Sequence, residues 1–394
     1  MTEKLRIGFI PLLDATTLLV AVDLGFAAAE GLDVELVREV SWSNVRDKLN
    51  IGLFDAAHLL SPVAIASSLG TGHVRVPLVA PFNLAVNGNA ITVSSRLFAA
   101  LANAADGDLG DPKVSSRTLA RVVSDRKARG IEPLTFGMTF PFSNHNYQLR
   151  FWMAAGGVDP DEDVRLVVLP PPYMVESLAS GHVDAFCVGA PWNSVAVDLG
   201  IGNILHFGCE IMAHVSEKVL ALRRRWADEN PYTVVQLVRA LANASRFAAV
   251  AGNRERVAQI VARRLGKSQQ LVLHTLAGHL KINANGALRS NDSYIVIGGH
   301  GVNRPDPVQA AWAYAQIVRW GQAPLSERLQ ADAESVFSSY LYDAAVGAAD
   351  SELQREGRDP IGAFAGDVFN AKDITGYLIA WRNRPVQPRL SLVR

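Results

Sequence analysis

The order of apolar and polar stretches predicts that strands and helices alternate from the beginning of the chain. Short apolar runs at residues 5–10 and 34–37 are typical of buried strands. Between them the pattern changes to a helical period, with a helix that begins at Thr16 or Thr17 and ends near Gly31. A strand, a helix and a second strand in this order favour a parallel strand pair with a crossover helix. The pattern therefore predicts an α/β fold.

The densest run of such signals lies at residues 140–192. Ser143 is a suitable N-cap for a helix, whose first turn presents free backbone N–H groups and the positive end of the helix dipole. After this helix we expect a strand at residues 164–169, a helix at 174–179 and a strand at 183–188. In such sheets ligands bind beyond the carboxyl ends of the strands, so the residues at 189–192 are candidates for a site.

Trp42 is a candidate because it falls between a predicted strand and a predicted helix. It lies in the loop Ser41-Trp42-Ser43, and Ser43 is the expected N-cap of a helix over residues 44–51. Indole rings are common both as packing residues at the rim of a cleft and as walls on which ligands stack. Both interpretations of Trp42 stay open.

Asn89 is a candidate because the chain is expected to cross between two lobes beside it. Strands predicted at residues 76–79 and 90–93 flank a polar stretch at residues 83–89, which contains an Asn-Gly pair typical of a tight turn. A crossing at this turn would let Asn89 face the cleft.

The length of 394 residues suits two lobes, each with its own core. We place the first lobe at residues 1–90 and 209–394 and the second lobe at residues 91–208. From residue 232 onward the apolar positions follow helical spacing, which predicts covering helices rather than carriers of a site. Pro385 and Pro388 indicate a loose C-terminal tail.

The composition excludes several classes of partner. The chain is 49% hydrophobic and 19% charged, and its 38 basic side chains balance 38 acidic ones, so nothing favours nucleic acid or an anionic membrane. No apolar run reaches the ~18 residues that span a bilayer. Pro11 and Asp14 interrupt the apolar run near the start, which argues against a secretory signal and leads us to expect a cytoplasmic protein. Cys187 and Cys209 lack metal or redox spacing and are expected to be structural thiols.

No group of residues suggests catalysis. The candidates for acid, base or nucleophile are His145, His214 and Cys187, which lie far apart in the sequence, and neither GxSxG nor HExxH occurs. The two histidines also lack the close spacing of metal ligands. We therefore expect a protein that is not an enzyme and that uses no metal or cofactor.

Anion binding fits the residues better. His145, in the first turn of the helix capped by Ser143, supplies a donor and, when protonated, a positive charge, although it equally well caps its own helix. Pro191 suits the first turn of another helix, so a second helix start is expected near the same cleft. His58, on a predicted strand, is more typical of a hydrogen-bonded core residue than of a ligand.

Several segments together resemble one known family. They are FIPLLDATTLLVAVDLGF, SWSNVRDKLNIGLFDAAHLLSP, NGNAITV, HNYQLRFWMAAGGVDPDEDVRLVVLPPPYMV, VDAFCVGAPWN, EKVLALRRRWADENP and VRWGQ. They are similar to the nitrate- and bicarbonate-binding proteins of ABC importers. The resemblance implies the two α/β lobes of the periplasmic-binding-protein type II fold, a ligand cleft between the lobes and additional C-terminal helices. Importer members are exported or lipid-anchored, so this chain most resembles the cytoplasmic branch, a nitrate/nitrite sensor that holds an RNA-binding antiterminator inactive.

The resemblance also implies roles for particular residues. It assigns the ligand wall to Trp42, an amide to Asn89 and a histidine to His145. Where the family's glutamine is expected this chain has Asn89, one methylene shorter, and where nitrate binders have a lysine and bicarbonate binders a glutamate it has Ala213. His145, His214 and the helix dipoles would then balance the charge of the anion. The expected ligand-binding set is Trp42, Asn89, His145, Asn146, Pro191 and His214.

These observations lead to a hypothesis about function. We expect a cytoplasmic sensor that binds a small oxyanion, nitrate or nitrite, in the cleft and controls a regulatory partner such as an antiterminator, without contacting nucleic acid or entering a membrane itself. The alternative is the solute-binding subunit of an ABC importer for nitrate, bicarbonate or a related anion. A third class, an enzyme such as a pyrimidine-precursor synthase, lacks its cysteine-rich segment here.

Overall fold

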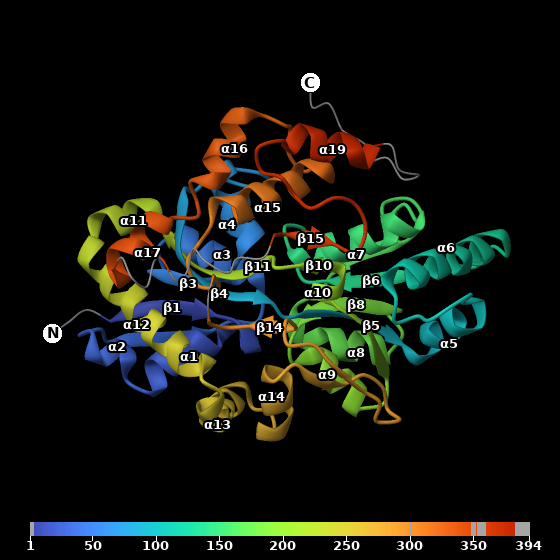
Figure 1. The fold of residues 1–394 in the computed structure, drawn as a ribbon, viewed down its shortest axis with the longest axis horizontal. Helices are drawn as coiled ribbons and strands as arrows, with labels where there is room; N and C mark the ends of the chain where they lie inside the picture. Colours follow the sequence, from blue (N-terminus) through green and yellow to red (C-terminus); the bar gives the residue numbers. More distant parts are fainter. Residues whose placement is uncertain (1–3, 300, 348–351, 353–359, 383–394) are drawn as a thin grey trace.

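Two β-sheets form the centres of two lobes. The structure is a computed structural model that describes residues 4–299, 301–347, 352 and 360–382. The first sheet consists, from edge to edge, of β14 (Ile295–Val296), β4 (Leu78–Asn87), β11 (Ser216–Arg223), β3 (Ala56–Leu60), β1 (Leu5–Phe9) and β2 (Val34–Arg38) (Figure 1). The second sheet consists of β7 (Arg165–Val168), β6 (Thr135–Met138), β8 (Ala185–Gly189), β5 (Asn89–Ser94) and β9 (Gly202–Phe207).

Helices surround both sheets. Around the first sheet lie α1 (Thr16–Asp23), α2 (Phe26–Ala29), α3 (Trp42–Asn50), α4 (Ser61–Leu69), α11 (Arg224–Glu229), α12 (Pro231–Ala249), α13 (Arg254–Leu265) and α17 (Ser339–Val346). Around the second lie α5 (Ser95–Ala104), α6 (Pro112–Ala128), α7 (Asn144–Gly156), α8 (Met174–Ala179), α9 (Trp192–Asp198) and α10 (Gly208–Ile211). The later part of the chain adds α14 (Gln269–Leu276), α15 (Pro307–Arg319), α16 (Glu327–Glu334) and α19 (Ile374–Arg382). A small pair joins β12 (His279–Lys281) to β13 (Leu288–Ser290).

The chain crosses between the two sheets twice. β1 pairs in parallel with β2 and β3, and β6 with β7 and β8, as the strand-helix-strand order predicts. β4 leads directly into β5 of the other sheet through Gly88, whose φ of 106° lies in the region that favours glycine. The return runs from β9 through α10 to β11, and β11 pairs antiparallel with β3 and β4. β5 begins at Asn89 and β9 ends at Phe207, beside the limits of 91 and 208 expected for the second lobe.

β4 is longer than the sequence predicts. Instead of a strand at residues 76–79 followed by a polar stretch, a single strand of 10 residues runs to Asn87, and every one of its residues is buried. The reason is that its polar side chains find partners inside the protein. Asn83 donates to Gln309 Oε1 (2.9 Å) and accepts from Ser216 Oγ (3.0 Å), so a polar sequence is compatible with a buried strand.

The helix after β2 begins earlier than predicted. Ser41, not Ser43, is the N-cap of α3, because its hydroxyl accepts from the backbone N–H of Asn44 (3.2 Å). Trp42 is therefore the first residue of the helix rather than a loop residue, and it is buried, with 1% of its surface exposed.

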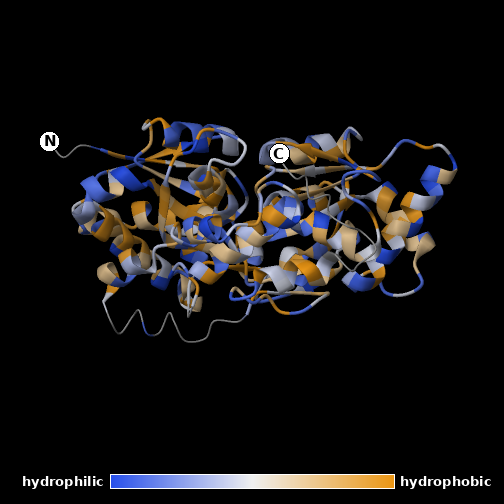
Figure 2. Cartoon of the chain, turned by 90° about the horizontal axis from the view of Figure 1, so that it is seen from above, coloured by the Kyte–Doolittle hydropathy of each residue, from blue (hydrophilic) through white to orange (hydrophobic). Residues whose placement is uncertain are grey.

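Buried apolar side chains pack between strands and helices, and the two largest clusters each continue across both lobes, with Leu59 and Phe136 in one and Ile7 and Phe207 in the other. In Figure 2, which shows the molecule from above, hydrophobic residues are frequent on the strands inside the lobes. Cys187 in β8 is fully buried and Cys209 half-buried. Within the described residues, no helix has the length and apolarity that crossing a membrane requires. The tail predicted around Pro385 and Pro388 lies outside the described residues.

The C-terminal part of the described chain contacts both lobes. β15 (Gly362–Ala363) pairs with β10 (Met212–Ala213), which follows α10, and α19 lies near α7 of the second lobe (Figure 1). The Trp381 ring of α19 lies 4.5 Å from the Phe151 ring of α7, between centroids. The guanidinium carbon of Arg319, at the end of α15, lies 3.8 Å from the centre of the same indole ring. Because α15 packs against α4 of the first lobe, α19 joins the two lobes.

Candidate functional site

A group of charged side chains is completely buried where the two lobes meet. β11 supplies Glu217 and Lys218, and the 3-10 helix η1 (Leu13–Ala15) supplies Asp14. The Lys218 ammonium lies 2.9 Å from Asp14 Oδ2 and 2.7 Å from Glu217 Oε1. His58 Nε2, from β3, lies 2.8 Å from Asp14 Oδ1. Buried charges are costly unless paired, so these contacts are what makes the arrangement possible.

An irregularity in β11 explains how two successive residues join one group. In a regular strand Glu217 and Lys218 would point to opposite faces of the sheet. The pairing of β11 with β4 shifts register between Ser216 and Lys218 and again between Lys218 and Val219. Such bulges turn side chains away from strict alternation and occur next to binding sites.

Lys218 and Asp14 hold each other in the ionised state. Burial alone would lower the pKa of Lys218, but the carboxylates of Asp14 and Glu217 raise it above its ordinary value. Burial alone would raise the pKa of Asp14, but Lys218 and His58 hold it well below its usual range. For His58, burial outweighs the attraction of Asp14 and lowers the pKa, so the imidazole is neutral at pH 7.

Trp42 is a wall of this group, beside its cation. The Lys218 ammonium lies 5.2 Å from the centre of the Trp42 ring, a cation–π distance, and the His58 ring lies 5.4 Å away, between centroids. Trp42 was interpreted from the sequence either as a packing residue or as a wall of the ligand site. The indole is buried and also faces the charged residues, so the structure is compatible with both.

The second lobe contributes hydrogen-bond donors to the same place. Asn89 Nδ2 and Asn144 Nδ2 each donate to Glu217 Oε2 (2.8 Å), and Asn144 also donates to the Ser216 carbonyl (2.8 Å). His145 Nε2 lies 3.7 Å from Glu217 Oε1, and its Nδ1 lies 3.0 Å from Thr139 Oγ1. These contacts connect the start of β5 and the first turn of α7 to β11 of the other lobe.

His145 is neutral at pH 7. Complete burial, together with the positive charge of Lys218, lowers its pKa to about 4, although Glu217 opposes this shift. The positive charge that the sequence suggested for His145 is therefore absent at neutral pH. The cation of the site is Lys218 instead.

Unpartnered polar atoms gather at this junction. Six buried side-chain atoms of this group and its neighbours lack a hydrogen-bond partner among the described residues: Trp42 Nε1, His58 Nδ1, Asn89 Oδ1, Asn144 Oδ1, His145 Nε2 and Gln148 Nε2. Gly189, at the end of β8, leaves space beside them, since a Cβ there would lie 3.4 Å from Asp14 Oδ2 and 3.6 Å from Asn89 Oδ1. Buried polar atoms without partners are expected to meet a ligand or water.

The structure brings together only part of the predicted ligand-binding set. Trp42, Asn89 and His145 meet at the junction, as described above. Asn146 faces away, because its Nδ2 donates to the Pro141 carbonyl (2.8 Å) and its Oδ1 accepts from Arg150 (3.1 Å).

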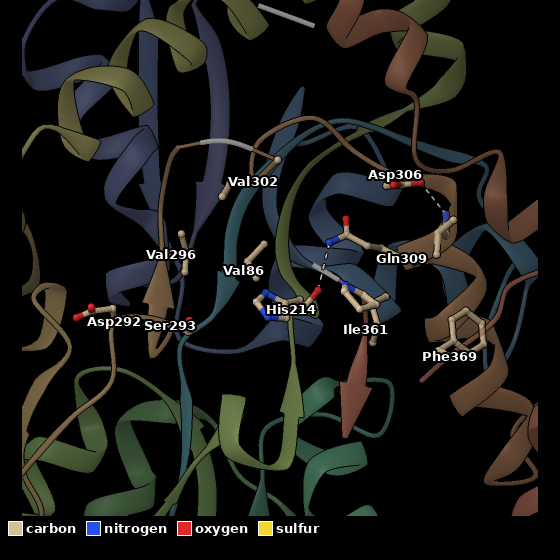
Figure 3. A pocket seen from close by; sticks show the side chains of 13 residues that line it. Val86, His214, Asp292, Ser293, Val296, Val302, Asp306, Gln309, Ile361 and Phe369 are labelled. Carbon is tan, nitrogen blue, oxygen red and sulfur yellow. Dashed lines mark hydrogen bonds between the residues drawn. The ribbon is translucent and has the colours of Figure 1, made fainter. Parts of the chain in front are cut away.

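Pro191 offers no polar side chain to the charged group, and His214 lines a pocket elsewhere. Pro191 precedes α9, a helix of 7 residues, and has no N–H to offer. His214 lines a separate pocket of about 470 Å³, together with Val86, Gln309 and Ile361 (Figure 3). Its backbone carbonyl accepts from Gln309 Nε2 (3.4 Å).

Ala213 carries no charge, and the charged residues of the junction lie elsewhere on the same segment. It lies in β10 and pairs with Gly362 of β15. The charge follows shortly after, at Glu217 and Lys218, which both face the junction. The sequence contains a sign of their role, because two charged residues stand near the beginning of SEKVLALR, a strand that is mostly apolar. Asp14, Asn144 and Gln148 were also missed.

The fold and the buried polar junction define a solute-binding protein with two α/β lobes, of the periplasmic-binding-protein class. The chain belongs to the NMT1-like family, whose model matches residues 1–262. The crystal structure of the periplasmic nitrate-binding protein NrtA from Synechocystis superposes with a TM-score of 0.86 at 25% identity, over 95% of this chain and 97% of that one. The predicted fold class and the resemblance to nitrate- and bicarbonate-binding proteins are thereby confirmed.

Curated relatives agree with this assignment. The nitrate/nitrite binding protein NrtA of Nostoc sp. is 30% identical over 363 residues, which are 89% of this chain and 79% of the relative. The bicarbonate transport ATP-binding protein CmpC of Synechococcus elongatus is 32% identical over 380 residues, 95% of this chain. The chain spans only 54% of the length of CmpC.

Proposed function

We propose that the chain is the solute-binding component of an import system for a small oxyanion, with nitrate and nitrite as the first candidates. The carrying observation is the buried ammonium of Lys218, placed at the interlobe junction beside Trp42, Asn89 and His145. The relatives reported above bind nitrate or belong to transport systems, and they favour the importer over the sensor. The cytoplasmic location and the antiterminator-type partner stay predictions.

The junction has the donors that a small oxyanion needs. An ammonium has three N–H groups, and Asp14 and Glu217 take two of those of Lys218. Trp42 Nε1 and Gln148 Nε2 are further N–H groups without a partner among the described residues. When the Thr139 hydroxyl donates to His145 Nδ1, Nε2 carries the hydrogen and is a donor as well.

Glu217 and Lys218 also indicate which anions the site is expected to bind. The family resemblance associates a lysine with nitrate and a glutamate with bicarbonate, and this chain carries both residue types at the junction, as Glu217 and Lys218. Nitrate and nitrite only accept hydrogen bonds, whereas bicarbonate can also donate one to an acceptor such as Asn89 Oδ1. The candidates are therefore nitrate, nitrite and bicarbonate, and binding measurements decide among them.

We expect nitrate or nitrite to release or absorb heat on binding to the purified protein in titration calorimetry. Bicarbonate and methanesulfonate are titrated in parallel, with chloride as a control for ionic strength. Saturable binding of one small oxyanion, with chloride inert, is the expected result. No binding of nitrate, nitrite or bicarbonate would contradict the proposed function.

His145→Ala is expected to weaken oxyanion binding strongly, about 10-fold to 100-fold, because it removes a buried polar atom that has no hydrogen-bond partner among the described residues. His58→Ala is the matched control. It removes a contact to Asp14 and is expected mainly to lower stability. The dissociation constant and the urea midpoint are measured for both variants. Equal loss of binding in the two would contradict the roles assigned to them.

A further inference from the structure

Glu217 already occupies the donors that converge on the interlobe junction. Its Oε2 accepts from Asn89 Nδ2 and Asn144 Nδ2, both at 2.8 Å. Its Oε1 accepts from Lys218 Nζ at 2.7 Å and lies 3.7 Å from His145 Nε2. The side chain is completely buried. The carboxylate is thus surrounded by donors from both lobes, as a bound anion would be.

A carboxylate has the shape and charge of the proposed ligands. It is planar, and its negative charge is shared between oxygens, as in nitrate, nitrite and bicarbonate. Bidentate acceptance from several N–H donors is the usual way in which proteins hold such groups. A small oxyanion that enters this junction therefore competes with Glu217 for the same donors.

The charges of Asp14, Glu217 and Lys218 also indicate that an oxyanion competes with Glu217. Asp14 and Glu217 face one ammonium, that of Lys218, so one negative charge of the group is left without a partner of opposite sign. An incoming anion adds another, in surroundings where like charges repel strongly. Binding becomes favourable when the carboxylate of Glu217 leaves the donors.

We propose that Glu217 is an internal occupant of the oxyanion subsite. In the absence of ligand its carboxylate satisfies Asn89, Asn144 and Lys218 and holds the lobes together. An oxyanion binds by replacing it on these donors. The inference rests on the proposed function, because it takes the ligand to be a small oxyanion.

Two substitutions test this role. Glu217→Gln keeps the shape of the side chain and removes its charge, and we expect it to bind nitrate at least about 10-fold more tightly than the wild-type protein. Glu217→Ala leaves the donors vacant, and we expect formate to bind there and raise the unfolding temperature of this variant. Formate is the smallest carboxylate, so it stands in for the missing group.

Asp14→Asn is the matched control. It removes the same charge from the same group but leaves the carboxylate of Glu217 on its donors, so we expect no stabilisation by formate. If Glu217→Ala does not fold, the nitrate affinity of Glu217→Gln decides alone. Nitrate binding that is unchanged or weaker in Glu217→Gln, or formate binding that is equal in Glu217→Ala and Asp14→Asn, would overturn the inference.

The results separate this inference from the proposed function. If the wild-type protein binds an oxyanion and the Glu217 variants bind no better, the inference fails and the function stands. If neither the wild-type protein nor the variants bind nitrate, nitrite or bicarbonate, both fail. Nitrate binding by Glu217→Gln alone supports the role of Glu217 as occupant, whereas the lack of binding by the wild-type protein contradicts the proposed function.

Discussion

Replacing Lys218 with methionine is expected to lower the free energy of unfolding by about 3–5 kcal/mol, the range found when one partner of a buried ion pair is removed. Methionine has a similar volume, so the loss is one of charge rather than of packing. Asp14 and Glu217 would then be buried without the ammonium that both contact, at 2.9 Å and 2.7 Å. Urea unfolding followed by circular dichroism measures the change.

The control is a lysine whose ion pair is exposed. Lys127 Nζ lies 3.4 Å from Asp163, and its side chain is 78% exposed, so Lys127→Met is expected to cost less than about 1 kcal/mol. Adding Asp14→Asn and Glu217→Gln to Lys218→Met is expected to restore part of the lost stability, since no uncompensated charge then remains. Equal effects of Lys218→Met and Lys127→Met would show that the buried group is not held by its charges.

Acidification is expected to destabilise the protein through His145. Its pKa of about 4 in the folded state lies below the ordinary value of 6.5, so the unfolded chain binds more protons between these values. The stability that His145 contributes is therefore complete above pH 6.5 and is lost as the pH falls to 4. The loss is about 3 kcal/mol. His58 and His206, whose pKa values burial also lowers, act in the same direction.

The contribution of His145 is separated by substitution. We expect the free energy of unfolding of His145→Gln to fall less steeply between pH 7 and pH 4 than that of the wild-type protein, by about 3 kcal/mol over the range. Urea unfolding at several pH values between 7 and 4 measures the slope for both proteins. A wild-type slope in His145→Gln would mean that its imidazole is not held neutral by burial.

The sequence predicts the elements better than their ends. The capped helix after Ser143 is present as α7, since the Ser143 hydroxyl accepts from the Asn146 N–H (3.1 Å). β4 was cut short because polar residues were taken to leave the sheet, although Asn83 is satisfied inside it. Ser41 and Ser43 are equally suitable N-caps by residue type, so the sequence alone does not show which one begins the helix. The backbone geometry shows that it is Ser41.

The candidate site was predicted only in part, for reasons that particular residues show. Trp42, Asn89 and His145 were predicted from their places beside strand ends and a helix start, and the family resemblance assigned their roles. On α7 the helical period places Asn144, His145 and Gln148 towards the junction and turns Asn146 away from it. Asn146 was predicted as a ligand because it directly follows His145 in the sequence.

Glu217 and Lys218 were missed because strict strand alternation would send them to opposite faces. The register shifts of β11 that bring them together depend on its pairing with β4. The sequence does not display this pairing. Asp14 joins them only through the fold, since it lies far from β11 along the chain.

The contact of Trp381 with both lobes has a consequence for the energetics of closure. Separation of the two lobes would require the indole to leave either Phe151 of the second lobe or Arg319 at the end of α15. Part of the free energy that holds the lobes together therefore comes from aromatic and cation–π contacts remote from the charged group. If the proposed oxyanion binds between the lobes, it needs to supply only the remainder, so the conformational change lowers its apparent affinity less. Helix α19 would in this way help the protein to retain a weakly bound anion.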